Sequence, residues 1–353
     1  MRFGVTCLAS LLLFLLFTSA RGVGPIGPRD SDAGRLTIPV SDDTGFYLQD
    51  FSTSFSISIG SKVFFAQSED SNRFEDLTPV FRIWEQGILL YSIDARGNLA
   101  GTSHQTGMNQ HGLCMELVGL PFLPTSTDPQ KEAWWMSNLL PLRYCTNVSE
   151  ATEWVLSRNI EIFGDCMPYQ IHFADRFGDA VVVSAGIDGE LHCTFKDNNH
   201  IVCTNFNLQH PENRYGEYPC PRYNTANEML SAIGSEVDLD HFVIRDVLEA
   251  VGIEDISNKS VSYIFDPVNQ QAYLYFRHDY SKVLRLDVNG IASNLGDGEE
   301  LECSLVELYN NGHNFTIDEP STEEHFLIIV VTGSISAVSI LVAFTMIRRR
   351  SET

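Results

Sequence analysis

Six groups of polar, glycine and aromatic residues follow one another between Ser52 and Phe276. In chain order they are Ser52-Thr-Ser-Phe55 with Glu69-Asp70, Gly107-Met-Asn-Gln-His-Gly-Leu113, Tyr169-Gln-Ile-His-Phe-Ala-Asp175 with Gly178-Asp-Ala-Val-Val182, Thr204-Asn-Phe-Asn-Leu208, Tyr218-Pro-Cys-Pro-Arg-Tyr223 and Tyr273-Leu-Tyr-Phe276. They contain hydroxyl, carboxylate, amide and guanidinium groups. Acyl transfer uses such groups, because a hydroxyl attacks a carbonyl carbon once a base takes its proton, and an amide N–H stabilises the resulting oxyanion.

Metal-dependent chemistry has no support in the spacing of the usual ligands. The chain has 8 cysteines and 10 histidines, but it contains no CxxC pair and no HxH or HExxH spacing. Structural metal sites normally show such local pairs. We therefore predict no metal and no cofactor.

In order and spacing, the six groups resemble the linear amide C–N hydrolases of the N-terminal nucleophile (Ntn) superfamily, which includes choloylglycine hydrolases and penicillin acyltransferases. The resemblance covers Ser52 to about Asn289. It implies an α+β fold with a four-layer αββα sandwich, self-cleavage that exposes the nucleophile, and hydrolysis or transfer of a linear non-peptide amide. A nucleophile at a new N-terminus has its own α-amino group beside it as base, with an unperturbed pKa of about 7.7 to 8.0.

The resemblance also implies roles for four residues. Ser52 takes the position of the family's cysteine nucleophile, and Asp70 has the spacing of the aspartate that orients the nucleophile's amine. Asn205 matches the asparagine that donates to the oxyanion, and Arg222 matches an arginine close to the family's active site. The implied partner is a small-molecule amide.

Several positions depart from the family pattern around this chemistry. Serine is a weaker nucleophile than the family's cysteine, whose thiolate is partly populated near neutral pH. Ala66-Gln67-Ser68 replaces the usual Gly-Asn-Asn, and Val118 replaces an asparagine. Glu116 is either a polar substitute in that pocket or a residue on the solvent face of its strand.

Two main hypotheses follow, and we favour the first. The chain is an amidase or acyltransferase that uses a self-exposed Ser52, or it is a catalytically inactive Ntn-fold ectodomain that serves in binding, adhesion or reception. A third hypothesis is a structural ectodomain without a pocket.

Regular elements must position these groups. Alternating or continuous apolar runs predict strands, and a 3.6-residue apolar period predicts helices. The predicted strands are Thr53–Ile59, Lys62–Ala66, Val80–Trp84, Ile88–Ile93, Leu113–Val118, Gln170–Ala174, Ala180–Ser184, Glu190–Phe195, His200–Thr204, Ser262–Phe265, Ala272–Arg277 and Val283–Leu286. The predicted helices are Lys131–Arg143, Ser149–Ser157, Asn224–Ile233 and Leu239–Ala250. Blocks of strands alternate with blocks of helices, which favours layered α+β over βαβ winding.

The two ends of the chain carry targeting patterns. Residues 1–20 combine Arg2, an apolar run and small residues before a cleavage point, which predicts a signal peptide. Residues 326–347 are apolar and uncharged, long enough to cross a hydrocarbon core of about 30 Å, and an arginine cluster follows them. We predict a single-pass type I membrane protein whose bulk is extracellular or lumenal, at the cell surface or in an endolysosomal compartment. Between the ends lie a leader (21–51), the Ntn-like domain (52–316) and an acidic stalk (317–325), and a cytoplasmic tail (348–353) follows.

The charge balance excludes nucleic acid as a partner. Asp and Glu number 46 against 23 Lys and Arg, giving a formal net charge of -23. Such a surface repels phosphate backbones. The sequence leaves oligomeric state open.

Secretory processing adds two further expectations. Three sequons, at Asn147, Asn258 and Asn314, are candidate glycosylation sites. After the signal peptide, seven cysteines remain in an oxidising compartment, and six are candidates for disulfides by spacing. The suggested pairs are Cys193 with Cys203 across a hairpin, Cys145 with Cys166, and the remaining Cys220 with Cys303.

Overall fold

A computed structural model of the protein describes residues 50–71, 77–95, 102–120, 132–133, 140–158, 160–161, 169–186, 190–209, 220–253, 260–311, 316–317, 328–331 and 341–344. The predicted signal peptide, the leader up to residue 49, most of the acidic stalk and the predicted cytoplasmic tail lie outside these residues, as do Asn258, Asn314 and Cys166.

The first sheet carries Ser52 and is antiparallel throughout. Its strands, in spatial order, are β12 (His200–Cys203), β1 (Asp50–Ile59), β2 (Lys62–Ser71), β13 (Val261–Asp266), β14 (Gln271–Phe276), β15 (Lys282–Asp287) and β17 (Thr316–Ile317). β1 and β2 form a hairpin around Gly60, whose φ of +62° suits a residue without a Cβ. The hairpin fixes which residue of β2 lies opposite each residue of β1.

The second sheet is also antiparallel. Its strands, in spatial order, are β11 (Leu191–Phe195), β10 (Ala180–Ala185), β9 (Tyr169–Ala174), β6 (Cys114–Gly119), β5 (Thr102–Met108), β4 (Leu89–Ala95), β3 (Leu77–Trp84) and β16 (Glu300–Ser304). β6 lies in its centre and faces β1 of the first sheet.

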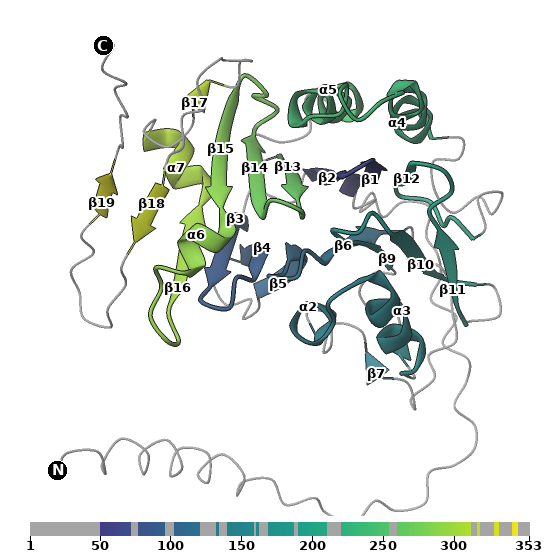
Figure 1. The fold of residues 1–353 in the computed structure, drawn as a ribbon, viewed down its shortest axis with the longest axis horizontal. Coiled ribbons are helices and arrows are strands. Elements are labelled where there is room, and N and C mark those ends of the chain that lie inside the picture. The colour runs from purple at the N-terminus through teal and green to yellow at the C-terminus, as the bar shows by residue number, and fades with distance from the viewer. Residues whose placement is uncertain are drawn as a thin grey trace, which may run out of the picture. The chain divides into compact units, whose positions relative to one another are not determined.

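Helices cover the outer face of each sheet, so the domain has four layers (Figure 1). α4 (Pro221–Ala232) and α5 (His241–Val251) pack on the first sheet, and α2 (Leu140–Tyr144) and α3 (Val148–Leu156) pack on the second. Three clusters of buried apolar side chains fill the three spaces between layers. The short helices α6 (Val288–Ala292) and α7 (Leu305–Asn311) follow β15 and β16. This arrangement confirms the α+β class and the αββα layering.

Capping residues and proline explain where the observed helices begin. α3 begins directly after its cap, Asn147, whose side chain accepts a hydrogen bond from the Glu150 N–H, so the helix starts one residue before the predicted Ser149. The predicted helix Lys131–Arg143 is contradicted near its start and confirmed at its end. Glu132–Ala133 is a short strand, β7, parallel to β8 (Ile160–Glu161), whereas residues 140–143 belong to α2, and residues 134–139 lie outside the described residues. Pro141 lies in the first turn of α2, a position that proline fits, whereas one continuous helix from Lys131 would place it in the interior.

The predicted disulfides between Cys193 and Cys203 and between Cys220 and Cys303 are wrong, since all four of these cysteines are free. Cys193 lies on β11 at the edge of the second sheet, whereas Cys203 ends β12 at the edge of the first, so the two strands are not hairpin partners. Cys145 is also unbonded, and its predicted partner Cys166 lies outside the described residues.

The predicted membrane segment, residues 326–347, is described only in part. Ile328–Val331 (β18) and Leu341–Phe344 (β19) form a two-stranded antiparallel sheet. Within the described ranges, the structure contains no helix that is both long and apolar enough to span a bilayer.

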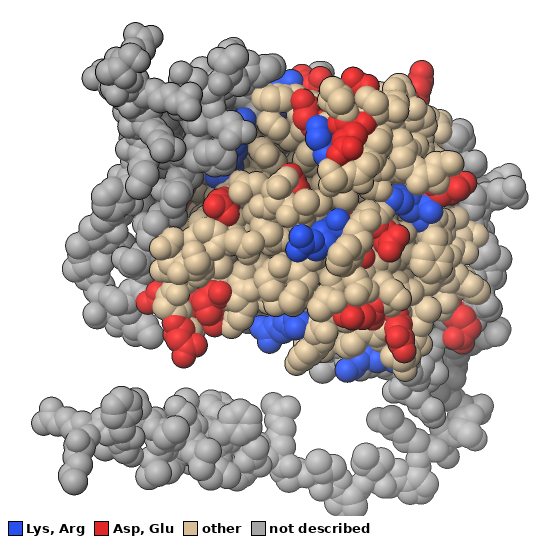
Figure 2. All heavy atoms as spheres, viewed as in Figure 1, with Lys and Arg blue, Asp and Glu red and all other residues tan. Residues whose placement is uncertain are grey.

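The visible surface carries its charges in small separate groups (Figure 2). Acidic and basic side chains are interspersed on the face shown, and no broad basic area appears there.

Candidate active site

Ser52 lies near the start of β1, at the point where its neighbour β12 ends. The pairing of β1 with β12 aligns Ser54 with Cys203, the last residue of β12. Two residues further on, Asn205 stands in line with Ser52. Its side-chain Oδ1 accepts a 2.8 Å hydrogen bond from the Ser52 backbone N–H, in place of the backbone carbonyl that a longer β12 would supply. The end of the strand thus leaves the Ser52 backbone to side-chain partners.

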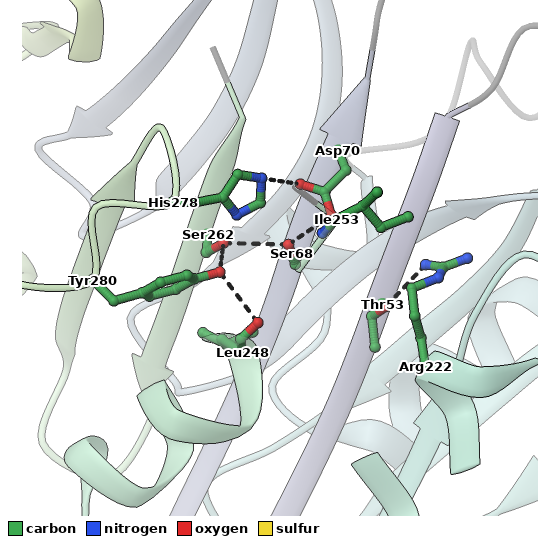
Figure 3. Close-up of polar contacts among 9 residues, drawn as sticks. All are labelled: Thr53, Ser68, Asp70, Arg222, Leu248, Ile253, Ser262, His278 and Tyr280. Atoms are coloured by element: carbon green, nitrogen blue, oxygen red, sulfur yellow. Dashed lines mark hydrogen bonds and ion pairs between the residues drawn. The ribbon is translucent and has the colours of Figure 1, made fainter. Parts of the chain in front are cut away.

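Arg222 completes the contacts of the Ser52 backbone. It lies in the first turn of α4, after Pro221 at the position that favours proline, and its side chain is buried. Its Nη1 donates to the Ser52 carbonyl oxygen at 2.8 Å and to Thr53 Oγ1 at 2.9 Å, and its Nη2 donates to Asn205 Oδ1 at 2.9 Å. Figure 3 shows the guanidinium reaching Thr53 from the helix. One planar guanidinium therefore ties together the strand, the helix and the Asn205 amide.

The Asn205 amide is engaged at both ends. Its Oδ1 accepts from Ser52 and Arg222, and its Nδ2 donates to the Gly119 carbonyl oxygen at 2.8 Å at the end of β6. With two donors on one end and an acceptor on the other, the amide orientation is fixed. In the intact chain, Asn205 holds the nitrogen of Ser52, and its N–H is used by the backbone of the second sheet.

The Ser52 side chain points into the space between the sheets and meets Glu69. The two residues are direct partners in the β1–β2 register, and both are buried. Ser52 Oγ donates to Glu69 Oε1 at 3.2 Å, and Gln67 Nε2 donates to the same oxygen. Side chains are especially close in such a pair when the backbone groups point away from the partner strand, as those of Ser52 do. Glu69 is thus a site residue that our sequence analysis did not select.

Asp70 is not brought to Ser52, contrary to the role that the resemblance implied. Successive side chains of a strand point to opposite faces, so Asp70 lies on the helix-covered face when Glu69 faces the second sheet. Its carboxylate accepts hydrogen bonds from Ser68 Oγ and the Ile253 N–H, both at 3.2 Å, and lies 2.9 Å from His278 Nε2. Figure 3 shows Asp70 directed toward His278. Asp70 therefore joins β2 to the chain after α5 and to the turn after β14.

A stripe of buried polar side chains continues between the sheets beyond Ser52. Ser54 Oγ and Ser56 Oγ lie 2.8 and 3.2 Å from the two ring nitrogens of His172, on β9. Burial lowers the pKa of His172 to about 3, so the ring is neutral at physiological pH. The ring joins the two sheets by hydrogen bonds without introducing a charge.

Glu116 lies in the same stripe and not on a solvent face. It is fully buried on β6, and it accepts a hydrogen bond from the Tyr263 hydroxyl. Burial raises the pKa of the Glu116 carboxyl to about 8, against the opposing effect of hydrogen bonds from Tyr263, Thr106 and Gln67. The carboxyl is therefore mostly protonated at neutral pH. Val118, two residues on, lies in the apolar cluster between the sheets.

We expect Glu116→Gln to change how stability depends on pH. The folded state keeps the Glu116 proton up to about pH 8, whereas the unfolded chain releases it near pH 4.5, so the wild type loses stability as pH rises between these values, by about 1 kcal/mol per pH unit. Glutamine does not titrate. In urea unfolding at pH 5 and pH 8, the variant should gain about 2 to 4 kcal/mol relative to wild type at the higher pH.

The same comparison has an outcome that contradicts this protonation state. A difference in unfolding free energy between Glu116→Gln and wild type that is equal at pH 5 and pH 8 means that Glu116 does not hold a proton in the fold.

Metal binding has no visible site in the described ranges, where no three His, Cys, Asp or Glu side chains are grouped to hold an ion. The arrangement instead presents a hydroxyl with a carboxylate acceptor beside it, and a backbone nitrogen and carbonyl held by an amide and a guanidinium. These groups suit acyl transfer at Ser52.

Comparison with known proteins defines the class. The family model described as acyl-coenzyme A:6-aminopenicillanic acid acyl-transferase matches residues 60–243, slightly more than half of the chain. The chain therefore belongs to this family, which lies within the Ntn superfamily, as the sequence resemblance indicated. The match includes Glu69, Asn205 and Arg222 but begins after Ser52. No curated protein sequence matches the chain.

Two solved structures have a fold similar to that of this chain. A variant of the conjugated bile acid hydrolase from Clostridium perfringens is 13% identical, with a TM-score of 0.54 over 71% of this chain and 96% of that chain. Penicillin V acylase from Agrobacterium tumefaciens is 15% identical, with a TM-score of 0.52 over 72% of this chain and 91% of that chain. At these identities the likeness establishes an Ntn-hydrolase fold.

Proposed function

We propose that the protein is an amidohydrolase or acyltransferase that acts on linear, non-peptide amide C–N bonds and uses Ser52 as an N-terminal nucleophile. The observation that carries the proposal is the environment of Ser52, whose nitrogen, carbonyl and hydroxyl are each held by a separate buried or half-buried side chain. A serine that only filled space between sheets would not need three such partners.

The contacts fit two successive reactions at one residue. In the first, the Phe51–Ser52 peptide bond is cleaved and the nitrogen of Ser52 becomes a free amine. Asn205 Oδ1, already 2.8 Å from that nitrogen, then holds the amine beside the hydroxyl. In the second, Ser52 Oγ attacks the carbonyl of an amide substrate, the amine takes the hydroxyl proton, and an acyl-enzyme forms as the substrate's amine leaves. Water then gives hydrolysis, and another amine gives acyl transfer.

We propose further that the enzyme is anchored in a membrane of the secretory pathway, with its catalytic domain outside the cytosol. The apolar segments 1–20 and 326–347 and the sequons support this location. Of the sequons, Asn147 is described: it caps α3 and is half-buried. Resistance of the full chain to alkaline carbonate extraction, with a glycosidase-sensitive mass, is the expected result; release into the soluble fraction contradicts the anchor.

The alternative, an inactive ectodomain that binds a ligand, rests on a specific observation. Asn205 Nδ2 donates to the Gly119 carbonyl, and Val118 lies where relatives carry an asparagine, so the described site has no free side-chain amide to stabilise an oxyanion. Backbone N–H groups must then take that role if the site is catalytic.

Amine release from N-acyl substrates separates the two functions. The full chain, purified from membranes of a secretory host, is incubated with a panel of N-acyl amino acids, N-acyl ethanolamines and penicillin V, and free amine is quantified. Turnover of at least one substrate class is expected. Binding of a panel member without release of amine, by a chain shown to begin at Ser52, supports the inactive ectodomain instead.

A further inference from the structure

Glu69 is the carboxylate best placed to act on the Ser52 hydroxyl. Within the described residues it is the acidic side chain recorded in hydrogen-bond contact with Ser52 Oγ, at 3.2 Å, and only 6% of its surface is exposed. A buried base close to the proton that it accepts satisfies the first requirement for general base catalysis. Asp70, on the other face of β2, does not.

Gln67 holds the Glu69 carboxylate in place. Gln67 is fully buried two residues earlier on the same face of β2, and its Nε2 donates to the same Glu69 oxygen that faces Ser52. Its Oε1 is buried without a hydrogen-bond partner. The amide therefore has a fixed donor end toward Glu69 and an acceptor end that requires a donor.

Glu116 supplies the missing donor when it is protonated. Its side chain is in hydrogen-bond contact with Gln67, Tyr263 donates to its Oε2, and its Oε1 is also buried without a partner. Because both Glu116 Oε1 and Gln67 Oε1 are buried acceptors without a donor, a proton on Glu116 is the group that would let these neighbouring side chains bond through them. Two carboxylates that share a buried network resist ionising together, so a protonated Glu116 favours the charged form of Glu69.

We propose that Glu69 takes the Ser52 hydroxyl proton during self-cleavage, and that Gln67 and protonated Glu116 position Glu69 for this step; the proposal rests on the function proposed above. Ser52 Oγ bonds to the Phe51 carbonyl carbon as its proton passes to Glu69. The proton then moves to the Ser52 nitrogen as the carbon–nitrogen bond breaks, leaving an ester. Water hydrolyses the ester, giving the Phe51 carboxylate and restoring the Ser52 hydroxyl.

This assignment explains why serine works at a position where relatives carry cysteine. A thiol is partly ionised near neutral pH and needs little help, whereas a hydroxyl depends on a base before the α-amine is free. In the intact chain that amine is still a peptide nitrogen bonded to Asn205. The first cleavage therefore needs another base, and Glu69 is in contact with the hydroxyl.

Pulse–chase labelling of the full chain in a secretory host tests the proposal, with N-terminal sequencing to identify the product. The measured quantity is the half-time of conversion to the form that begins at Ser52. Glu69→Gln should lengthen it about 100-fold or more, in line with the usual contribution of a general base. Glu69→Asp should lie between Glu69→Gln and wild type. Asp70→Asn is the matched neighbour and should retain the wild-type half-time.

The role as a base to serine predicts an interaction with the nucleophile. In the Ser52→Cys background, Glu69→Gln should lengthen the half-time by less than about tenfold, because the thiol supplies its own ionised form. A purely structural role predicts equal delays in both backgrounds. If Glu69→Gln does not fold, as judged by its melting temperature, Glu69→Asp is compared in the two backgrounds by the same criterion.

The outcomes distinguish failure of the role of Glu69 from failure of the proposed function. Suppose that the wild type is cleaved at Ser52. If Glu69→Gln is then cleaved as fast as wild type, or is delayed equally in the wild-type and Ser52→Cys backgrounds, the role of Glu69 is overturned and the proposed function stands. Wild type that keeps its Phe51–Ser52 bond overturns both.

Discussion

Ser52→Ala is expected to leave the Phe51–Ser52 bond intact in every molecule and to reduce amide turnover to background. The hydroxyl is the attacking group in both proposed reactions, and alanine removes it without changing the backbone contacts to Asn205 and Arg222. Because the side chain is small and buried, the fold should persist. Intact mass and amine release, measured on wild type and variant purified in parallel, check the result.

Ser54→Ala is the matched control. Ser54 lies two residues along the same strand, is equally buried and faces the same side, but its hydroxyl contacts His172 and not Glu69. It should be cleaved at Ser52 as fully as wild type. Cleavage that survives Ser52→Ala, or that fails in both variants alike, contradicts the assignment of Ser52 as nucleophile.

Arg222→Met is expected to lower the free energy of unfolding by about 2 to 4 kcal/mol and to abolish cleavage at Ser52. Methionine keeps the apolar stem but removes the donors to the Ser52 carbonyl, Thr53 Oγ1 and Asn205 Oδ1. Hydrogen bonds from a charged donor contribute about 1.5 to 3 kcal/mol each, but the net loss is smaller than their sum because methionine also removes the cost of burying a charge. Urea denaturation and N-terminal sequencing measure the two effects.

Arg222→Lys separates charge from geometry. Lysine keeps the positive charge, but its single ammonium cannot reproduce the planar fork that reaches three acceptors from one position. We expect an intermediate loss of stability and slow cleavage. A lysine variant equal to wild type in both measurements would mean that charge alone is required, and a methionine variant equal to wild type would remove Arg222 from the site.

Most of the fold could be predicted from the sequence, because the apolar residues of each strand and helix recur with the period of that element. The apolar run at Thr53–Ile59 and the helical spacing at Ser149–Ser157 both lie within a few residues of β1 and α3. The helix predicted over Lys131–Arg143 agrees with α2 at residues 140–143 but not with the strand at Glu132–Ala133, and Pro141 disfavours one continuous helix through this segment. The strands at Thr102–Met108 and Glu300–Ser304 were missed.

The cysteine pairs failed for a different reason. Cys193 and Cys203 stand close together in the chain, and local spacing does not reveal that β11 and β12 belong to different sheets. Sheet membership is set by long-range pairing, here of β12 with β1 and of β11 with β10. Sequence distance alone therefore could not decide which thiols face one another.

The site was predicted in part. Family resemblance selected Ser52, Asn205 and Arg222, which the structure brings into contact. It also selected Asp70, although Glu69 is the residue that meets Ser52. A signal for Glu69 was present: a hairpin that turns at Gly60–Ser61 places Glu69 opposite Ser52 when residues are counted outward from the turn, and strand alternation then directs Asp70 to the other face.

N-terminal sequencing of the full chain purified from a secretory host tests the central claim most directly. The account predicts a mature chain that begins at Ser52, with the nucleophile's amine free beside Asn205. A chain that begins near Arg21 and keeps the Phe51–Ser52 bond would contradict it, because the Ser52 nitrogen would remain a peptide nitrogen and could not serve as the catalytic base.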